Sequence, residues 1–566
     1  MQQINLLWLD INASFSHSSL ALPALHAQCQ NQEWNRQIEW KSITASINTN
    51  LSLVITQILQ HKPDIIAATS WLFTSDYLLA VLQRVKTLCP HVTIVLGGPE
   101  FLGNNETYLS QHNYISAVFR GEGEIVFPQW LQAYIKTNKQ LVEPYCNDTV
   151  IDGLCYIDSK GVYHDNGIAK VQNYDQLAFP ETSPFFCKTK AFVQLETTRG
   201  CFNTCAFCVS GADKPVRSLS LDSIKKRLDM YAEWGVENVR LLDRTFNGSS
   251  KRAIELLLLF EKYKDKLAFH LEIHPAYLSE EVRAKLQTMP KGLLHLEAGI
   301  QSLRKDVLTK SDRIGDLSKA IDGLSFLGSL ENIETHLDLI AGLPGYTLQA
   351  IKEDIQSLAR FNADEIQLET LKLLPGTKMR NNATSLGLKY STQPPYEILE
   401  SDSMSYAELC KAMQYSRVID LFYNAKQWQI ITRYLLLIDI DFIDHFTNWL
   451  DSKGVLQSLL SIEKRGLLLY EYCALFHPEL LEAHTLAWIE ADLTLKKYPI
   501  KNLRRWMDEI PSNTLVLRGI YSTEMYLYHL KSCLLELDKI KECEIIVGIP
   551  KGITTDKQLF IAILNS

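Results

Sequence analysis

The chain has 566 residues, 46% of them hydrophobic, and a formal net charge of −8. This length predicts a protein of about three or four domains, each large enough to bury a core. The net charge is negative and the chain has no long run of basic residues, so the composition does not favour nucleic-acid binding. No stretch reaches the roughly 18 apolar residues that a membrane span needs, and "MQQINLLWLD" lacks the basic start of a signal peptide, so we expect a cytoplasmic protein.

The first part of the chain alternates apolar runs with amphipathic stretches of helical length. The apolar runs are residues 4–9, 64–70, 91–98 and 115–121. This alternation predicts a parallel sheet wound with helices, that is, a doubly wound, Rossmann-like α/β domain over residues 1–145.

Ligands of such domains bind beyond the carboxyl ends of the strands. The four predicted strand ends are rich in glycine, serine or charge, and glycine lets the backbone approach a ligand closely. The alternative is that turns after strands use glycine in any case. The candidate binding residues at these ends are His17, Ser70, Gly97, Gly98, Pro99, Glu100, Gly121, Glu122, Gly123 and Glu124.

Residues 146–190 are rich in turn residues and proline, which indicates a linker with a small hairpin. Between residues 191 and 385, strand-like and helical segments then alternate six times, as in a partial (β/α)6 barrel. After residue 400, long helical periodicity predicts a mainly α-helical C-terminal domain over residues 400–566. The six strand-like segments are residues 192–198, 238–246, 267–275, 293–302, 334–345 and 364–376.

One group of cysteines stands apart from the other, mostly isolated ones. Cys201, Cys205 and Cys208 follow the first predicted barrel strand, at the end where active sites of such barrels lie. A structural zinc site needs four ligands, usually in two separated pairs. The spacing C-x-x-x-C-x-x-C offers three thiolates, which fits a 4Fe-4S cluster with one iron open to a small ligand, and an aromatic residue, Phe207, precedes the last cysteine. A structural zinc or a chance grouping is the alternative.

The loops "VLGGPE" and "FRGEGEIVFPQW" resemble those of the cobalamin-binding domain that precedes many radical S-adenosylmethionine (SAM) enzymes. The segment "NASFSHSSLALPAL" resembles the opening of one uncharacterised branch of that family. The resemblance implies that residues 1–145 bind cobalamin. The chain lacks the D-x-H-x-x-G element whose histidine ligates cobalt, and His17 is either a substitute or a capping or packing residue. We therefore expect cobalamin without a lower ligand from the protein.

Residues 192–376 resemble the radical SAM superfamily, in which three cysteines hold a 4Fe-4S cluster whose open iron binds SAM. One electron from the cluster then cleaves SAM to methionine and a 5′-deoxyadenosyl radical. The resemblance implies that the three clustered cysteines are the cluster ligands and that later strand ends contact SAM, because carboxylates and amides suit ribose hydroxyls and a guanidinium suits a carboxylate. Taken singly, a glutamate or aspartate at a strand end is more often a cap or a salt-bridge partner, and it is the joint spacing of these residues after the cysteines that favours SAM contacts. The implied SAM contacts are Phe207, Asp243, Glu272, Glu297, Gln301, Arg313 and Asp338.

The family pattern is not complete in this chain. The glycine-rich "GGE" of many radical SAM enzymes is replaced by "LDRTFN", a form associated with the cobalamin-linked branch. The helical region after residue 400 resembles the uncharacterised tail of the same branch. No residue is assigned here as catalytic.

Together the resemblances imply a protein similar to class B radical SAM methyltransferases. In that class one SAM methylates cobalamin, and a second yields the radical that takes hydrogen from an unactivated carbon, which then receives the methyl group. The implied partners are an unknown small-molecule or peptide substrate and an electron donor such as flavodoxin or ferredoxin. The alternatives are a cobalamin-linked rearrangement or cyclisation without methylation, and a cluster-based redox or cobalamin sensor, which would not need the SAM contacts.

Overall fold

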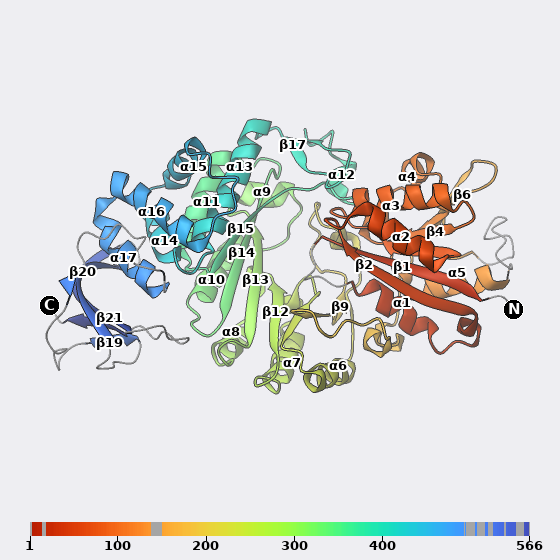
Figure 1. Ribbon diagram of the computed structural model, residues 1–566, viewed down its shortest axis with the longest axis horizontal. Coiled ribbons are helices and arrows are strands. Elements are labelled where there is room, and N and C mark those ends of the chain that lie inside the picture. Colours follow the sequence, from red (N-terminus) through yellow and green to blue (C-terminus); the bar gives the residue numbers. More distant parts are fainter. Residues whose placement is uncertain are drawn as a thin grey trace.

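The computed structural model describes residues 3–13, 19–136, 150–491 and 493 and, in the last part of the chain, 504–505, 515–518, 525–536, 539–550 and 560–564. Three parts follow one another along the longest axis of the molecule (Figure 1). They are an N-terminal doubly wound domain, a central barrel-like sheet, and a helical part that is followed by a further, antiparallel sheet. Among the described residues, no helix is both long and apolar enough to cross a membrane.

The N-terminal domain is a seven-stranded sheet in the order β2-β1-β3-β4-β5-β6-β7. Its first five strands are parallel, and β6 and β7 extend it as an antiparallel hairpin. The strands are β1 (Ile4–Asn12), β2 (Ile38–Ser46), β3 (Ile65–Thr69), β4 (Thr93–Gly97), β5 (Ala117–Phe119), β6 (Leu154–Ile157) and β7 (Tyr163–Asp165). The helices are α1 (Ala21–Cys29), α2 (Leu51–His61), α3 (Ser75–Leu88), α4 (Glu106–Gln111) and α5 (Gly123–Lys136).

Both faces of this sheet are covered by helices. Alternating residues of β1 belong to two cores: Leu6 and Trp8 pack with α1 and α5, whereas Leu7 and Leu9 pack with α2, α3 and α4. Strands that are buried on both faces are almost continuously hydrophobic, which is the pattern seen in the sequence. The prediction of a doubly wound domain is confirmed.

Two features of the N-terminal sheet differ from the expected arrangement. The hairpin expected in the linker exists, but β6 pairs with β5 through Cys155 and Val118, so the sheet continues beyond residue 145. Strand β2 was not predicted. It lies at the edge of the sheet, and several of its residues are partly exposed, which weakens its hydrophobic signal.

The central part is a sheet of six parallel strands in the order β15-β14-β13-β12-β11-β8, so the predicted partial barrel is confirmed. The strands are β8 (Val193–Leu195), β11 (Asn238–Leu241), β12 (Ala268–Ile273), β13 (Leu294–Gln301), β14 (Glu334–Ala341) and β15 (Glu365–Thr370). The helices between them are α6 (Leu221–Trp234), α7 (Ser250–Glu261), α8 (Glu280–Gln287), α9 (Lys305–Lys310), α10 (Leu317–Gly328) and α11 (Leu348–Arg360). A small antiparallel pair, β9 (Thr198–Arg199) and β10 (Arg217–Ser218), follows β8.

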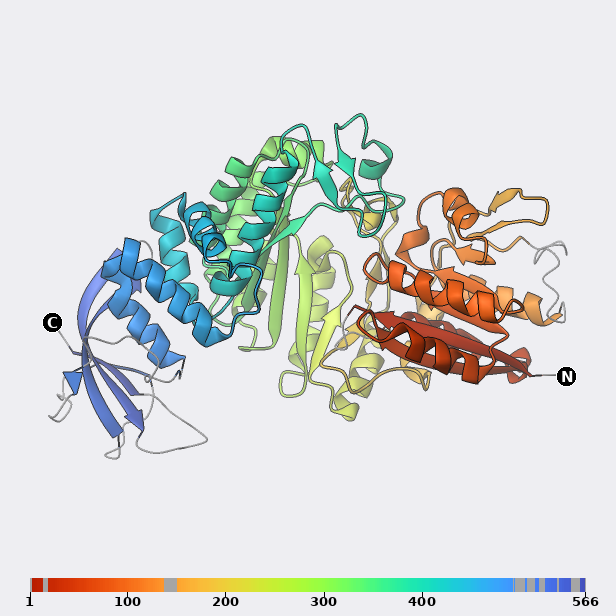
Figure 2. The same ribbon diagram turned by 45° about the horizontal axis from the view of Figure 1, so that its top comes forward.

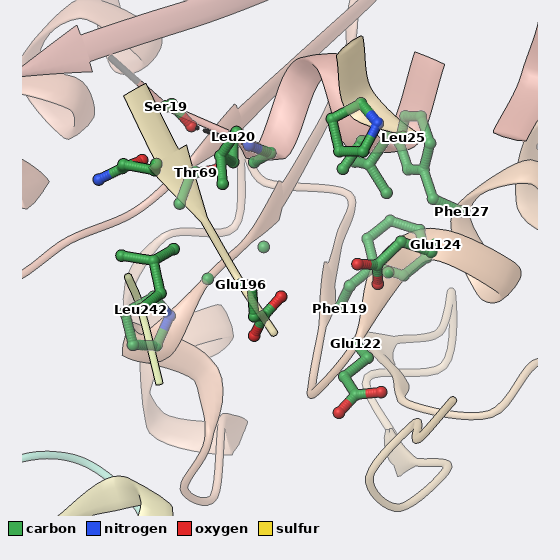
Figure 3. A pocket seen from close by; sticks show the side chains of 18 of the residues that line it. Ser19, Leu20, Leu25, Thr69, Phe119, Glu122, Glu124, Phe127, Glu196 and Leu242 are labelled. Atoms are coloured by element: carbon green, nitrogen blue, oxygen red, sulfur yellow. Dashed lines mark hydrogen bonds between the residues drawn. The ribbon is translucent and has the colours of Figure 1, made fainter. Parts of the chain in front are cut away.

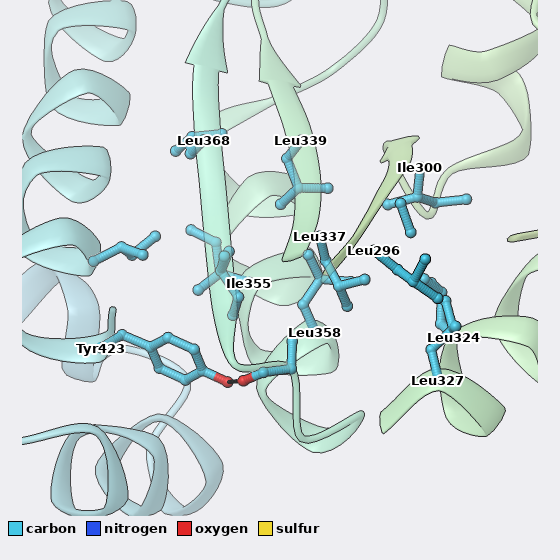
Figure 4. Packing of buried hydrophobic residues seen from close by; sticks show 14 of the residues in the cluster. Leu296, Ile300, Leu324, Leu327, Leu337, Leu339, Ile355, Leu358, Leu368 and Tyr423 are labelled. Atoms are coloured by element: carbon cyan, nitrogen blue, oxygen red, sulfur yellow. Dashed lines mark hydrogen bonds between the residues drawn. The ribbon is translucent and has the colours of Figure 1, made fainter. Parts of the chain in front are cut away.

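Buried leucines attach the helices to the outer face of the barrel sheet (Figure 4). Leu337 of β14 lies in one core with Leu324 of α10 and Leu358 of α11. Burial alternates along β13 and β14, so every second residue faces away from this core. Apart from Gly299 and Ile340, these other positions carry histidine, glutamate, aspartate or glutamine, which leaves the inner face of the barrel largely polar.

The C-terminal part begins with helices that pack beside β15 (Figure 2). The predicted helical domain is confirmed for α13 (Tyr406–Val418), α14 (Gln429–Ile438), α15 (Phe442–Ser452), α16 (Ile462–Phe476) and α17 (Leu481–Glu490). Before it lie α12 (Lys378–Asn381) and the pair β16 (Lys389–Tyr390) and β17 (Ile398–Glu400).

The last part of the chain is a five-stranded antiparallel sheet, which the sequence analysis missed. The leucine-rich "MYLYHLKSCLLE" was included in the helical region, but it pairs along its whole length with the next strand, and such pairing decides strand formation more than composition does. The order is β18-β20-β21-β22-β19, with β18 (Arg504–Arg505), β19 (Leu515–Arg518), β20 (Met525–Glu536), β21 (Lys539–Pro550) and β22 (Phe560–Leu564).

Side chains of the helical domain pair with the edge of the barrel sheet. Asn424 donates to the Ile366 carbonyl at 2.9 Å and accepts from the Ile366 N–H at 2.9 Å. The Tyr423 hydroxyl donates to the Ala363 carbonyl at 2.9 Å. The side-chain amide thus satisfies backbone groups of β15 that a neighbouring strand would otherwise bind.

Replacing Asn424 by alanine is expected to destabilise this junction. Both backbone groups of Ile366 would lose their partner in a partly buried place, which costs about 1–3 kcal/mol. Thermal unfolding followed by circular dichroism should show an earlier transition. Gln349→Ala removes an exposed amide on α11 and is the control that should leave the midpoint in place. An equal midpoint for both variants would contradict the edge-pairing role.

Candidate active site

The three clustered cysteines lie in a loop, residues 200–216, that connects β9 to β10. Arg199 and Arg217 are opposite each other in this antiparallel pair, which forms the stem of the loop. Gly200 begins the loop with a left-handed backbone, φ 86°, and a Cβ there would lie 2.4 Å from the Asp213 carbonyl oxygen. The close approach and the positive φ both require glycine.

A buried asparagine holds the loop against the segment after α9. The Asn203 amide donates to the Ile314 carbonyl at 3.0 Å, and its oxygen accepts from the Ile314 N–H at 3.0 Å. The Thr204 hydroxyl donates to the Asp312 carbonyl at 3.0 Å. These contacts fix the backbone between the first two cysteines. Asn203 was not among the predicted site residues; its polar side chain inside the cysteine motif was the available signal.

The thiols of the loop are close enough to influence one another. Burial raises the pKa of Cys205, the Arg313 guanidinium 3.3 Å from its sulfur opposes this, and Cys208 and Cys201 add to the rise. All three cysteines are free. In the described part of the chain, no three Cys, His, Asp or Glu side chains are arranged to hold a single metal ion. The loop supplies three thiolates, which fits a 4Fe-4S cluster with one iron open to a small ligand.

Three predicted SAM contacts lie on the inner face of adjacent strands. Glu272 of β12 is in register with Glu297 of β13, and Asp338 of β14 is in register with Gly299. Burial raises the pKa of Glu272 to about 7; Arg244, 4.0 Å away, opposes this, and the Glu297 and Asp338 carboxylates add to the rise. Glu272 therefore changes its charge near neutral pH.

Histidine side chains lie next to the other two carboxylates, Glu297 and Asp338. His270 Nε2 lies 2.9 Å from Glu297 Oε2, and His336 Nε2 lies 3.1 Å from Asp338 Oδ1. Burial tends to raise the pKa of Glu297, but the hydrogen bond with His270 and the nearby His336 lower it. The Glu272 side chain is 34% exposed, against 23% for Glu297 and 16% for Asp338. Glu272 is thus the most accessible of the three to a ligand.

Gln301, a predicted ribose contact, has an unusual backbone at the end of β13. Its φ is 72°, next to a register shift between β13 and β14. A left-handed residue other than glycine is uncommon, and the strain is about 1–3 kcal/mol. Buried Asp354 fixes the turn that follows, accepting from the Ser302 hydroxyl at 3.1 Å and the Leu303 N–H at 2.8 Å. The surrounding structure therefore holds Gln301 in place.

Arg313, predicted to face the SAM carboxylate, lies beside the cysteine loop. Its guanidinium donates to Cys205 Sγ and to the Gly299 carbonyl. A guanidinium in this place can also meet a carboxylate bound next to the cysteines. Phe207 is partly buried and packs against the barrel core. Direct contact of either residue with SAM stays a prediction.

Asp243 has different surroundings from those expected of a SAM contact. It is buried and accepts from the Thr197 N–H at 2.7 Å, the Thr198 N–H at 3.0 Å and the Thr197 hydroxyl. The carboxylate therefore holds the turn between β8 and β9, at the base of the cysteine loop. The predicted SAM contact of Asp243 is untested, and the structure gives the residue a structural role.

A cavity of about 810 Å³ lies between the carboxyl edge of the N-terminal sheet and the stem of the cysteine loop (Figure 3). Its inner walls include small and apolar residues such as Ala67, Val95 and Phe119, and Glu196 and Arg199 border it on the barrel side. Seven of the residues predicted to bind cobalamin line it: Gly97, Gly98, Pro99, Gly121, Glu122, Gly123 and Glu124.

The walls of this cavity fit a large cofactor with both apolar and polar parts. A Cβ at Gly98 would lie 2.7 Å from the Ser70 carbonyl oxygen, and one at Gly121 would lie 2.4 Å from the Ala169 carbonyl oxygen, so these turns need glycine. Trp8 lines the cavity, and its indole N–H is buried without a hydrogen-bond partner among the described residues. Cobalamin combines an apolar base with many amide oxygens and fits such walls.

Two other residues predicted to bind cobalamin, Ser70 and Glu100, are not among those that line the cavity. Ser70 is buried, and its hydroxyl donates to Ser75 Oγ at 3.3 Å. Glu100 is buried and accepts a hydrogen bond from the Tyr396 hydroxyl, which joins the N-terminal domain to the segment after the barrel. His17 lies outside the described residues.

Glu122 and Glu124 line the cavity, but their carboxylates bind arginines of the stem. Glu124 Oε1 lies 2.5 Å from Arg199 Nη2, and Glu122 Oε1 lies 2.7 Å from Arg217 Nη2. The turn of residues 121–124, which was predicted to bind cobalamin, thus lies at the cavity. Its two acidic side chains, however, connect the N-terminal domain to the stem of the cysteine loop.

Three family models match the chain. The B12 binding domain matches residues 9–131, the Radical SAM superfamily matches residues 195–358, and a protein family of unknown function, DUF4080, matches residues 384–506. The first two matches coincide with the domain that holds the cavity and with the barrel that carries the cysteine loop.

Curated relatives are similar over more than half of the chain. The uncharacterized methyltransferase PH0819 of Pyrococcus horikoshii is 26% identical over 362 residues, which cover 60% of this chain and 74% of the relative. The cobalamin-dependent radical SAM methyltransferase TokK of Streptomyces tokunonensis is 22% identical over 343 residues, which cover 56% of this chain and 48% of TokK. The matched region is therefore about half the length of TokK.

Solved structures share the fold. OxsB, a cobalamin-dependent SAM radical enzyme solved with aqua-cobalamin and SAM, gives a TM-score of 0.59 at 14% identity and covers 87% of this chain and 82% of its own. The methyltransferase TsrM from Kitasatospora setae, solved with cobalamin and a 4Fe-4S cluster, gives 0.53 at 16% identity and covers 72% and 81%. The cavity and the cysteine loop lie in the two parts that match the family models, so the chain combines an N-terminal B12-binding domain with a radical SAM domain.

Proposed function

We propose that this protein is a cobalamin-dependent radical SAM methyltransferase that acts on an unactivated carbon of a small-molecule or peptide substrate. The observation that carries the proposal is the position of the cavity: its walls belong to the B12-binding domain on one side and to the stem of the cysteine loop on the other. A reaction that uses two cofactors together requires their sites to face each other across a short distance.

Each part of the site has a defined task in this proposal. Cys201, Cys205 and Cys208 would hold three irons of the cluster, while Arg313 and Glu272 would bind the carboxylate and a polar group of SAM. When bound, the cluster supplies the electron that cleaves SAM, and cobalamin supplies a carrier for a methyl group. The polar inner face of the barrel would hold the substrate. Flavodoxin or ferredoxin is our proposal for the electron donor.

Product analysis under anaerobic conditions tests the proposal. The protein reconstituted with iron, sulfide and cobalamin is incubated with SAM and a strong reductant, and the nucleosides and the state of cobalamin are analysed. We expect both 5′-deoxyadenosine and methylated cobalamin. The nucleoside alone would favour a cobalamin-linked rearrangement or cyclisation, and absence of both products in protein with a verified cluster would refute the enzymatic proposal.

Removal of one cysteine should abolish cluster chemistry. Cys208→Ala leaves two thiolates in the loop, too few to hold the cluster, so its visible absorption and the formation of 5′-deoxyadenosine should both fall to background. Cys89→Ala is the matched control, because Cys89 is a partly exposed free cysteine at the end of α3. Unchanged SAM cleavage in Cys208→Ala would refute the assignment of the ligands.

Glu272 should make SAM binding depend on pH. Its pKa of about 7 means that the carboxyl is mostly neutral below that pH and ionised above it. An ionised carboxylate accepts hydrogen bonds more strongly and attracts the cationic SAM, so it should favour binding as pH rises. The Kd of Glu272→Gln divided by that of the parent should therefore increase between about pH 6 and about pH 8, by up to about tenfold.

The ratio of the two Kd values cancels the titration of SAM itself, because that titration affects the parent and Glu272→Gln equally. Glu369→Gln on the neighbouring β15 is the matched control: burial tends to raise the pKa of Glu369, but Lys372 at 2.9 Å lowers it, so its charge is constant in this range. A Kd ratio for Glu272→Gln that does not change with pH would remove Glu272 from the SAM site. The Kd values can be measured by calorimetry on cluster-loaded protein.

A further inference from the structure

The cavity loop and the cysteine loop are joined by a group of ion pairs that we call the stem cluster: Glu122, Glu124, Arg199 and Arg217. Besides the contacts at 2.5 and 2.7 Å given above, Arg199 Nη1 lies 3.4 Å from Glu122 Oε2. Glu124 lies in the first turn of α5 and Glu122 directly precedes this helix, whereas the two arginines belong to the stem β9–β10. The stem cluster therefore crosses from one domain to the other.

Several further groups hold each arginine. Arg199 Nε donates to Glu196 at 3.0 Å, and Arg217 donates to the Val171 carbonyl at 2.7 Å and to Asp213 at 2.8 Å. The two side chains are only 14% and 9% exposed. With so many directional partners and little contact with water, each guanidinium is held in one orientation.

The charges of the stem cluster depend on one another. Burial tends to raise the pKa of Glu124, but the adjacent Arg199 outweighs it, and the pKa is lowered. Burial likewise tends to lower the pKa of Arg199, and the carboxylates of Glu124 and Glu196 raise it instead. Removing one partner would leave a buried charge without compensation, which is strongly destabilising.

The stem cluster acts directly on the cysteine loop. Arg199 is followed by Gly200 and Cys201, and Arg217 closes the other end of the loop opposite Arg199. All three cysteines lie between the two arginines in the sequence. A shift of either arginine therefore moves an end of the loop and changes the spacing of the thiols.

We propose that Glu122 and Glu124 are positioning residues for the iron–sulfur cluster rather than cobalamin ligands. The inference rests on the proposed function only in that the three cysteines hold a cluster. Through the stem cluster, the N-terminal domain fixes both ends of the cysteine loop. In the same turn Gly121 and Gly123 line the cavity, so one short segment serves both cofactor sites.

The test compares cluster retention with cobalamin binding in the full chain. The cluster is reconstituted anaerobically, its loss to a ferrous chelator is followed by absorption, and the Kd for hydroxocobalamin is measured in parallel. We expect Glu124→Gln to lose its cluster about tenfold faster than the parent, because the buried charge of Arg199 loses its partner, while the cobalamin Kd stays within about twofold. Arg217→Lys keeps the charge but loses hydrogen bonds, so it should show a smaller increase in rate.

Glu106→Gln is the matched control, since Glu106 stands in the first turn of α4 as Glu124 does in α5, but is exposed to solvent. Its rate of cluster loss should equal that of the parent. Unchanged rates in both Glu124→Gln and Arg217→Lys would overturn the proposal, and so would a cobalamin Kd that rises as much as the rate of cluster loss. Neither measurement needs turnover of SAM, so the result can be interpreted even if methyl transfer is not found.

Discussion

The buried ion pairs between the start of α5 and the stem of the cysteine loop determine how the two cofactor sites face each other. Hydrophobic contacts alone would let two domains slide, because such contacts are not directional. The guanidinium groups of Arg199 and Arg217 instead bind carboxylates and carbonyls in fixed directions, which few relative positions of the domains can satisfy. Glu122, Glu124 and Arg199 line the cavity, so these ion pairs contribute to its shape.

The two faces of the barrel strands have different roles: one face packs against the helices, and the other carries the predicted site residues. Most outward residues of β13 and β14 are apolar and pack against helices, whereas most inward residues are charged or polar. On that inner face, the same residue type has opposite pKa shifts: burial raises the pKa of Glu272, and histidines lower that of Glu297. The neighbours, not the residue type, determine which carboxylate is free to change its charge.

The sequence predicted the regular features of the protein because these depend on local patterns. All six barrel strands, the doubly wound domain and the position of the cysteine loop follow from periodicity and spacing. The orientation of charged side chains depends on distant partners instead: Glu124 meets Arg199, 75 residues away, and Asp243 meets Thr197, 46 residues away. The C-terminal sheet was missed for the same reason, because pairing between strands and not composition defines β20.

The use of Glu122 and Glu124 in the stem cluster changes what is left for the cobalamin site. On the N-terminal side, the other described residues that line the cavity are glycines and uncharged side chains, so shape and backbone groups would hold much of the cofactor. Further charged groups at the cavity, such as Glu196 and Arg244, belong to the barrel side, where Arg244 lies 4.0 Å from Glu272. Because substrates are distinguished by charged and hydrogen-bonding groups, we expect substrate choice to be made by the barrel, while the N-terminal domain supplies a site of constant chemistry.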